Sequence, residues 1–317
     1  MFRMFVPGST IYYIPTYLFY KIDLSSIPLE DGSLLGDHYR FVRISSANEL
    51  RKRRGLLAAD SLSRAVMFGG LNYDLDEEEW MTAAVRYSKE GTFALRRSAI
   101  RGSERLVPLP GTAVEVKKIG ALMQERGWSV EQYSGSEGTA EAFLALDGHA
   151  PKLLHIATHG FYYDPKEGDN KPLFAGLKDA MALSGLAFAG ANAAWSNKSI
   201  PQGVYNGIVT AQEIAKMDLS GLELVVLSAC ETGEGRTTEE GIYGLQRAFK
   251  KAGAGTIVMS LWPVSDRVTQ EFMQLFYQGL LDPALNGDKL LAFNRAKGAI
   301  RAKYEEPVYW AGFVMMD

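Results

Sequence analysis

The sequence lacks most features that would place it outside the ordinary globular proteins. Its 317 residues include one cysteine, Cys230, so no internal disulfide can form and a zinc site built from several thiolates is excluded. No apolar run approaches the roughly 20 residues of a membrane-spanning helix, and the N-terminus lacks a signal-peptide pattern. We therefore expect a cytoplasmic protein with a free thiol and no membrane partner.

Neither sign of charge dominates. The chain has 34 Lys and Arg against 37 Asp and Glu, a net charge of -3, which gives no electrostatic case for binding nucleic acid. The phosphate-binding patterns G-x-G-x-x-G and G-x-x-x-x-G-K-[ST] are absent, as is the G-x-S-x-G nucleophile elbow. A nucleotide-binding α/β domain is therefore a remote alternative, and we expect no cofactor.

The pattern of apolar residues changes near Arg64. Before it, runs of β-branched and aromatic residues predict a β-rich part, in which 10–14 and 18–22 form a hairpin around Pro15. After it, continuous apolar strands alternate with helices, as in a parallel sheet covered on both faces. We therefore divide the chain into an N-terminal extension, 1–63, and an α/β domain, 64–317.

The elements of the α/β domain follow from apolar runs and helical spacing. Thr139 is a candidate N-cap, and Thr210 with Glu213 fits a capping box. The segment 74–110 shows no sustained period, and we interpret it as an insertion that is partly loop. Strands are predicted over 65–70, 128–133, 152–158, 183–189, 222–229, 256–262 and 308–316, and helices over 112–126, 139–146, 210–213, 240–252, 268–281 and 289–304.

Two reactive side chains directly follow predicted strands. His159 comes after the strand 152–158, and Cys230 after the strand 222–229. Because ligands bind at the carboxyl ends of strands in open α/β sheets, we expect these side chains to meet there. An imidazole can lower the pKa of a thiol or act as its base, which makes the thiol a nucleophile. The amides of Gly160 and Cys230 would then hold the developing oxyanion.

Each of these residues also has a structural alternative. A lone buried cysteine is usually an inert small hydrophobe, and a lone histidine is more often structural than catalytic. His155 lies in the middle of a predicted strand, where we expect a buried structural role. A metal site made of His155 and His159 lacks a third ligand nearby in the sequence. His38 and His149 fit surface or loop positions.

The motifs around these residues resemble those of the CHAT-domain peptidases, caspase-like cysteine proteases related to separase. The resemblance implies a caspase-like α/β/α sandwich with a mostly parallel central sheet, preceded by the β-rich N-terminal extension. It maps the general base onto His159, the nucleophile onto Cys230 and an oxyanion-hole amide onto Gly160. The matching motifs are 155–160 (HIATHG), 224–233 (LVVLSACETG), 240–245 (EGIYGL), 260–266 (SLWPVSD) and 309–313 (YWAGF).

Two further residues are candidates for substrate binding by analogy with relatives of this family. Separases have an acidic residue near the strand that follows the nucleophile's strand, and Asp266 lies at a comparable place. It would receive a basic side chain before the scissile bond, or it would simply cap a helix starting near Val268. Ser228 matches a lining position in caspases, with packing at a strand end as its alternative.

The resemblance predicts a cysteine endopeptidase that cleaves a specific protein substrate with a Cys–His dyad, after a basic residue, and that is regulated or latent. Loops at 161–182, 190–207 and 231–240 border the predicted site, and we expect them to order on activation. The expected partners are a protein substrate and an activator. The alternative function is a catalytically silent caspase-like interaction module.

Overall fold

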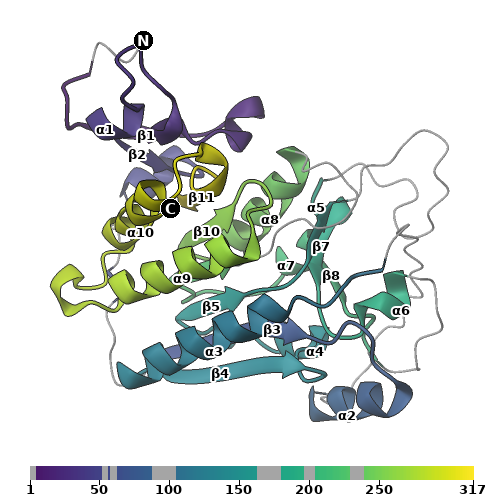
Figure 1. Cartoon of the computed structure of the whole chain (residues 1–317). Helices are drawn as coiled ribbons and strands as arrows, with labels where there is room; N and C mark the ends of the chain where they lie inside the picture. The colour runs from purple at the N-terminus through teal and green to yellow at the C-terminus, as the bar shows by residue number, and fades with distance from the viewer. Residues whose placement is uncertain are drawn as a thin grey trace.

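A computed structural model describes residues 5–51, 56–57, 63–87, 105–162, 180–195, 204–228 and 239–317. Its centre is an eight-stranded sheet (Figure 1). The strands form two parallel groups, which meet where β10 pairs with β11 in the antiparallel direction. In spatial order they are β1 (Thr10–Tyr13), β2 (Arg40–Arg43), β11 (Phe313–Met316), β10 (Thr256–Ser260), β9 (Leu224–Leu227), β5 (Leu153–Ile156), β3 (Arg64–Leu71) and β4 (Ser129–Gly135).

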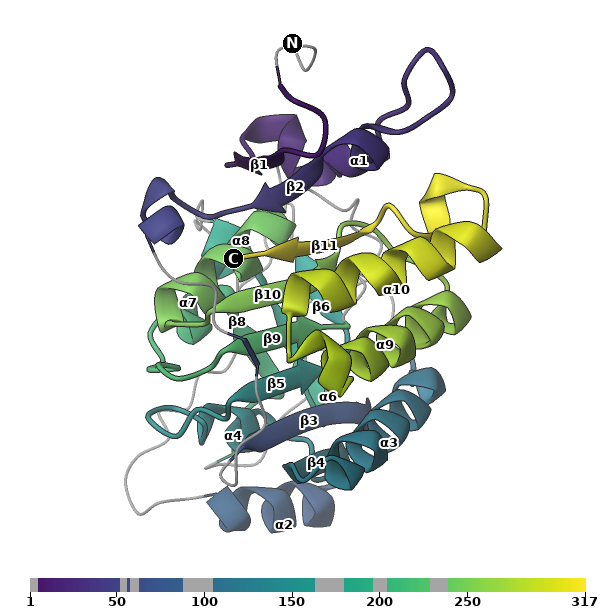
Figure 2. The same cartoon turned by 90° about the vertical axis from the view of Figure 1, so that its left-hand side faces the viewer.

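Helices cover both faces of this sheet (Figure 2). Successive strand residues feed opposite cores, because side chains alternate across a strand. In β3, Ala65 and Met67 pack into one core, while Val66 and Phe68 pack into the other. The first core is closed by α3 (Pro110–Glu125), α9 (Asp266–Leu280) and α10 (Lys289–Lys303), and the second by α4 (Ala140–Leu144), α7 (Ala211–Ile214) and α8 (Glu239–Ala252).

The predicted strand 183–189 exists, but it is not part of the central sheet. It forms β7 (Ser184–Ala187), which pairs in the antiparallel direction with β6 (Gly160–Tyr162) and β8 (Ile208–Thr210). β6 overlaps the start of the predicted loop 161–182, and β8 follows directly after the predicted loop 190–207. The small sheet continues the chain directly beyond His159.

The predicted N-terminal hairpin is wrong. β1 pairs with β2 in parallel, and β2 pairs with β11, so the N-terminal strands extend the central sheet. The second predicted strand is a 3-10 turn, η2 (Tyr17–Lys21). The carbonyls of Phe19, Tyr20 and Ile22 accept hydrogen bonds from the buried Arg43 guanidinium. A tertiary contact thus overrides the β propensity of this aromatic run.

The segment 74–110 contains a helix that the sequence analysis missed, α2 (Glu77–Tyr87). It starts with a reciprocal pair of bonds. The Glu79 amide donates to Asp76 Oδ1 over 2.8 Å, and the Asp76 amide donates to Glu79 Oε2 over 3.1 Å. This is a capping box, so the Asp-x-x-Glu spacing was a readable signal.

Other local predictions are confirmed. The Thr139 hydroxyl accepts from the Ala142 amide at the start of α4, and Thr210 forms the expected capping box with Glu213 at the start of α7. The last predicted strand is shorter than expected, because Pro307 opens a 3-10 turn, η6 (Pro307–Tyr309), before β11.

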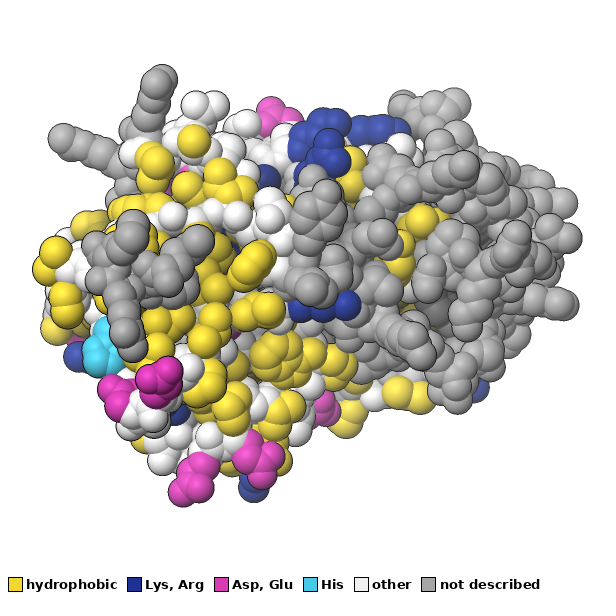
Figure 3. Space-filling view, turned by 90° about the horizontal axis from the view of Figure 1, so that it is seen from above, with side chains coloured by type: hydrophobic (Ala, Val, Ile, Leu, Met, Phe, Trp, Pro, Cys, Tyr) yellow, Lys and Arg dark blue, Asp and Glu magenta, His cyan; other side chains and the backbone are white. Residues whose placement is uncertain are grey.

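The N-terminal part has an apolar outer surface. Figure 3 shows hydrophobic side chains gathered on the face seen from above. The N-terminal part contributes seven large hydrophobic side chains that are each more than 40% exposed: Phe5, Val6, Tyr12, Ile14, Phe19, Leu50 and Leu56. Within the described part of the chain, no helix has both the length and the apolar character needed to cross a bilayer.

Candidate active site

The two strands that lead to the predicted dyad are hydrogen-bonded neighbours. β5 and β9 run in parallel, with Ile156 opposite Leu227. His159 follows three residues after Ile156, and Cys230 follows three residues after Leu227. Ser228 continues the pairing, since its amide donates to the Ile156 carbonyl over 2.9 Å. Cys230 itself lies outside the described residues, as do 163–179, 196–203 and 229–238 in the loops expected to border the site.

His159 is held by a backbone carbonyl rather than by a carboxylate. Its side chain is buried, and Nε2 lies 2.7 Å from the Val107 carbonyl oxygen. A carbonyl only accepts hydrogen bonds, so Nε2 must carry a proton. In the neutral imidazole the lone pair then lies on Nδ1. The bond to Val107 therefore selects the tautomer in which Nδ1 is the basic atom.

The environment of His159 favours its neutral form. Burial lowers the pKa of His159 below its ordinary value, while the bond to the Val107 carbonyl and the charge of Asp266 act in the opposite direction. The net effect is a lowered pKa, so at neutral pH the imidazole is mostly uncharged. A neutral imidazole is the form that can accept a proton from a thiol.

Tyr73 and β7 fix the backbone around His159. The Tyr73 ring lies 4.9 Å from the imidazole, centroid to centroid, and its hydroxyl lies 2.8 Å from Thr158 Oγ1. Burial raises the pKa of Tyr73 to about 12, so this hydroxyl stays protonated. Thr158 donates in turn to the Ala187 carbonyl, and the Ala187 amide donates to the His159 carbonyl. Gly160 follows as the buried first residue of β6.

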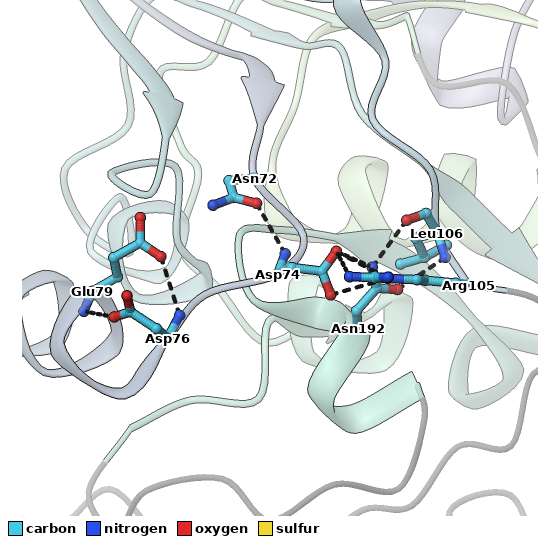
Figure 4. Close-up of polar contacts among 7 residues, drawn as sticks. All are labelled: Asn72, Asp74, Asp76, Glu79, Arg105, Leu106 and Asn192. Carbon is cyan, nitrogen blue, oxygen red and sulfur yellow. Dashed lines mark hydrogen bonds and ion pairs between the residues drawn. The ribbon is translucent and has the colours of Figure 1, made fainter.

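A polar clamp holds the segment that carries Val107 (Figure 4). Asn192 in α6 (Ala191–Trp195) bonds to both backbone groups of Leu106, each over 2.9 Å. Its amide nitrogen also donates to Asp74 Oδ2 over 3.0 Å, and Asp74 pairs with Arg105 over 2.7 Å. We call Asp74, Arg105 and Asn192 the clamp. Sequence reasoning missed all three, because no periodic or motif signal marks them.

The two predicted substrate-binding residues line one cavity. Ser228 and Asp266 share a space of about 30 Å³ with Glu115, Thr269 and Gln270. Ser228 Oγ and Thr269 Oγ1 are buried, and neither has a hydrogen-bond partner among the described residues. Because α9 begins at Asp266 itself, with Ser265 as its N-cap, the alternative that Asp266 only caps a helix starting near Val268 does not hold.

His155 has the buried structural role expected of it. It is fully buried, and its Nε2 and Nδ1 lie 2.8 Å from Glu115 Oε1 and 2.9 Å from the Tyr277 hydroxyl. Both ring nitrogens are thus engaged by protein groups and are not available to a metal. Within the described ranges, no group of three or more His, Cys, Asp or Glu could hold a metal ion.

Comparison with known proteins identifies the family. The model of the CHAT domain matches residues 4–317 of this chain. The chain belongs to the CHAT domain family. This confirms the resemblance to the CHAT domain family on which the predicted site rests.

A solved structure supports the predicted fold. Gingipain R, an Arg-specific cysteine proteinase, superposes on 97% of this chain and 62% of its own with a TM-score of 0.52 and 11% identity. The predicted caspase-like α/β/α fold is confirmed. Separase of Saccharomyces cerevisiae in complex with securin gives a TM-score of 0.44 and 10% identity over 87% of this chain and 13% of its own.

Among curated proteins, tetratricopeptide repeat protein 28 of Mus musculus is 35% identical over 112 residues. The human protein of the same name is 32% identical over the same length. Each match covers 34% of this CHAT domain but 4% of the relative, so the chain spans a small fraction of these proteins.

Proposed function

We propose that this CHAT domain is a cysteine endopeptidase in which Cys230 is the nucleophile and His159 is its base. The carrying observation is the bond from His159 Nε2 to the Val107 carbonyl, which directs the basic lone pair to Nδ1. The register of β5 and β9 supports the pairing, since both residues stand three positions beyond a hydrogen-bonded pair. Membership of a caspase-like peptidase family supports the same reaction class.

The proposed reaction has two stages. The Cys230 thiol gives its proton to His159 Nδ1, and the thiolate attacks the carbonyl carbon of the scissile peptide bond. The amides of Gly160 and Cys230 stabilise the oxyanion. His159 then protonates the leaving amine as the C–N bond breaks and a thioester forms. Water, deprotonated by His159, hydrolyses the thioester, releases the carboxylic acid and restores the thiol.

We also propose that the enzyme prefers a basic residue before the cut. Asp266 supplies a carboxylate at the cavity, and the unpartnered hydroxyls of Ser228 and Thr269 supply acceptors for an ammonium or guanidinium group. A space of about 30 Å³ is too small for a whole lysine side chain, so we expect it to take the charged end group. A protein substrate is the natural source of such a residue, and an activator remains the proposed regulatory partner.

The test is cleavage of a diverse peptide library by the wild type and three variants. Cys230→Ala should abolish cleavage. Asp266→Asn should lower the preference for a basic residue by about tenfold or more, the scale expected when a charge loses its partner. Asp282→Asn is the matched control, because Asp282 lies in an exposed pair with Arg295. A basic preference that survives Asp266→Asn would contradict the specificity proposal.

The same library separates the peptidase from a silent interaction module. Cleavage by the wild type that Cys230→Ala removes would exclude the silent module. If the wild type cleaves nothing, the reactivity of the Cys230 thiol decides. Reactivity that depends on His159 would indicate a latent peptidase, and reactivity that does not would indicate the silent module.

A further inference from the structure

A second pocket lies between the N-terminal part and α10. The two regions lie side by side in both cartoon views (Figures 1 and 2). The pocket has a volume of about 290 Å³, at the lower end for small-molecule sites. In the central sheet, β10 and β11 separate β2, which lines this pocket, from β9 and β5, which lead to the dyad.

The pocket is lined by a buried arginine whose hydrogen bonds are incomplete. Arg43 is 2% exposed, and its Nη2 donates to three backbone carbonyls of the turn that follows β1. Its Nε and Nη1 are also buried, and neither has an acceptor among the described residues. No carboxylate in the described part of the chain forms an ion pair with this guanidinium. The Tyr13 ring, whose centroid lies 5.9 Å from Arg43 Cζ, compensates part of this charge. A buried guanidinium without a counter-charge is still costly, and an anion would complete its hydrogen bonds.

The acidic residues at the pocket already have partners. Asp23 accepts from Lys297 Nζ over 2.5 Å, and Asp37 pairs with Arg301 over 2.6 Å. Lys297 is 8% exposed. Burial lowers the pKa of Lys297, Asp23 acts in the opposite direction, and the charge of Arg43 adds to the lowering. Arg43 and Lys297 are therefore close enough to repel each other, and among the described residues Asp23 forms its ion pair with Lys297 and not with Arg43.

A glycine in α10 borders the open space of the pocket. Gly298 lies inside this helix and lines the pocket, and a Cβ there would meet no atom within 4 Å. Glycine weakens a helix relative to alanine, so a helical glycine usually has a packing reason. Gly120 in α3 has one, since a Cβ would collide with Gln132. Gly298 has no such neighbour: it is exposed and borders the pocket, so a larger side chain there would enter open space at the edge of the pocket.

We propose that this pocket binds a small organic anion, whose carboxylate or phosphate group accepts hydrogen bonds from Arg43. The surplus positive charge selects an anion, and the free guanidinium N–H groups suit an oxygen acceptor. Tyr39, Phe41 and Phe293 also line the pocket, so the anionic group is attached to a ring or another apolar body. The volume limits this ligand to a small molecule. The proposal is independent of peptidase activity.

The test is isothermal titration of the full chain with benzoate, AMP and benzamide. Benzoate and AMP separate a carboxylate from a phosphate, and benzamide is the uncharged control. We expect saturable binding of at least one anion and none of benzamide. Arg43→Met and Gly298→Leu should each weaken that binding by about tenfold or more, the usual cost of losing a charged contact or a cavity.

Gly298→Leu and Arg295→Met separate a loss of binding from a loss of folding. Gly298→Leu fills open space and favours the helix, so it should fold even if Arg43→Met does not. Arg295→Met is the matched control, because Arg295 is also on α10 but is exposed and paired with Asp282. It should bind as the wild type does. The proposal is overturned if neither anion binds the wild type, if benzamide binds equally well, or if Gly298→Leu binds like the wild type.

Discussion

His159 shows how a single hydrogen bond sets the chemistry of a residue. The Val107 carbonyl holds the proton on Nε2, and the buried position keeps the ring mostly neutral. The importance of His159 could be predicted from its place after a strand. Val107 could not be predicted, because its role depends on a backbone oxygen and its own side chain is 61% exposed. Every residue type has a backbone carbonyl, so the sequence does not show which residue will act as this acceptor.

The clamp predicts that Asn192 positions His159 without touching substrate. Asn192→Ala removes both bonds to Leu106 and loosens the neighbouring Val107. We expect kcat to fall by about tenfold to a hundredfold with little change in KM, because misplacing a general base costs part of its contribution. The measurement is steady-state cleavage of the best library peptide. Asn206→Ala is a matched control, since Asn206 Oδ1 accepts a hydrogen bond from the nearby Ile208 amide.

A second readout separates positioning from a loss of structure. The chain has four histidines, so nitrogen NMR can resolve each imidazole. In the wild type we expect His159 to be protonated at Nε2. In Asn192→Ala the preference for this tautomer should weaken while the His155 signals stay unchanged. An unchanged His159 tautomer together with unchanged kcat would contradict the role of the clamp.

The lowered pKa of His159 predicts a pH dependence of stability. The folded state binds its proton at lower pH than the unfolded state, so the unfolded state binds more protons between the two pKa values. The stabilising effect is present above the ordinary pKa, about 6.5, and is lost as the pH falls toward the folded value. Urea unfolding at about pH 8, 7, 6 and 5 should show a smaller acid loss in His159→Gln than in the wild type. Equal losses would contradict the assigned direction.

At the scale of elements, a buried network joins α3, β5 and α9. Glu115, His155 and Tyr277 contribute one residue from each, and their hydrogen bonds connect positions 40 and 122 residues apart. Burial and the charge of Glu115 raise the pKa of Tyr277, so its hydroxyl stays protonated and is able to donate to His155 Nδ1. The spacing of apolar residues predicted both helices and the strand. It could not predict the network, because nothing local relates its members.

Removing one member of this network should destabilise the fold. Tyr277→Phe leaves His155 Nδ1 without its partner in a fully buried place, which costs about 1–3 kcal/mol of unfolding free energy. Tyr304→Phe is the matched control, since Tyr304 donates to Glu271 near the surface and its loss should cost about 0.5–1.5 kcal/mol or less. Urea denaturation measures both. An equal cost for the two variants would show that burial of the network adds nothing.

At the scale of the whole molecule, the N-terminal part and the α/β domain share one sheet. The alternation of buried strands and helices predicted the sandwich correctly. The pairing of β2 with β11 could not be predicted, because it joins Arg43 to Met316 across nearly the whole chain. Asp23 and Lys297 connect the same two regions, and both are more than nine-tenths buried. Such long-range contacts leave no periodic signal in the sequence.

The buried Asp23–Lys297 pair should contribute more to the unfolding free energy than the exposed Asp37–Arg301 pair at the same pocket. Asp23→Ala leaves Lys297 buried without its counter-charge, and we expect a loss of about 3–5 kcal/mol in unfolding free energy. The double variant Asp23→Ala, Lys297→Met should recover much of that loss. Asp37→Ala breaks an exposed pair at the same pocket and should cost about 1 kcal/mol or less. Urea denaturation measures these losses of unfolding free energy. Similar losses for Asp23→Ala and Asp37→Ala would contradict the role of the buried pair in joining the N-terminal part to α10.

The central claim is that His159 activates Cys230, and the rate of thiol alkylation tests it most directly. Cys230 is the only cysteine in the sequence, so iodoacetamide labelling measured by mass spectrometry reports on that residue alone. Near neutral pH, the wild type should be labelled about tenfold or more faster than His159→Ala, because a neighbouring imidazole raises the thiolate fraction. Equal labelling rates in the folded wild type and His159→Ala would contradict the dyad.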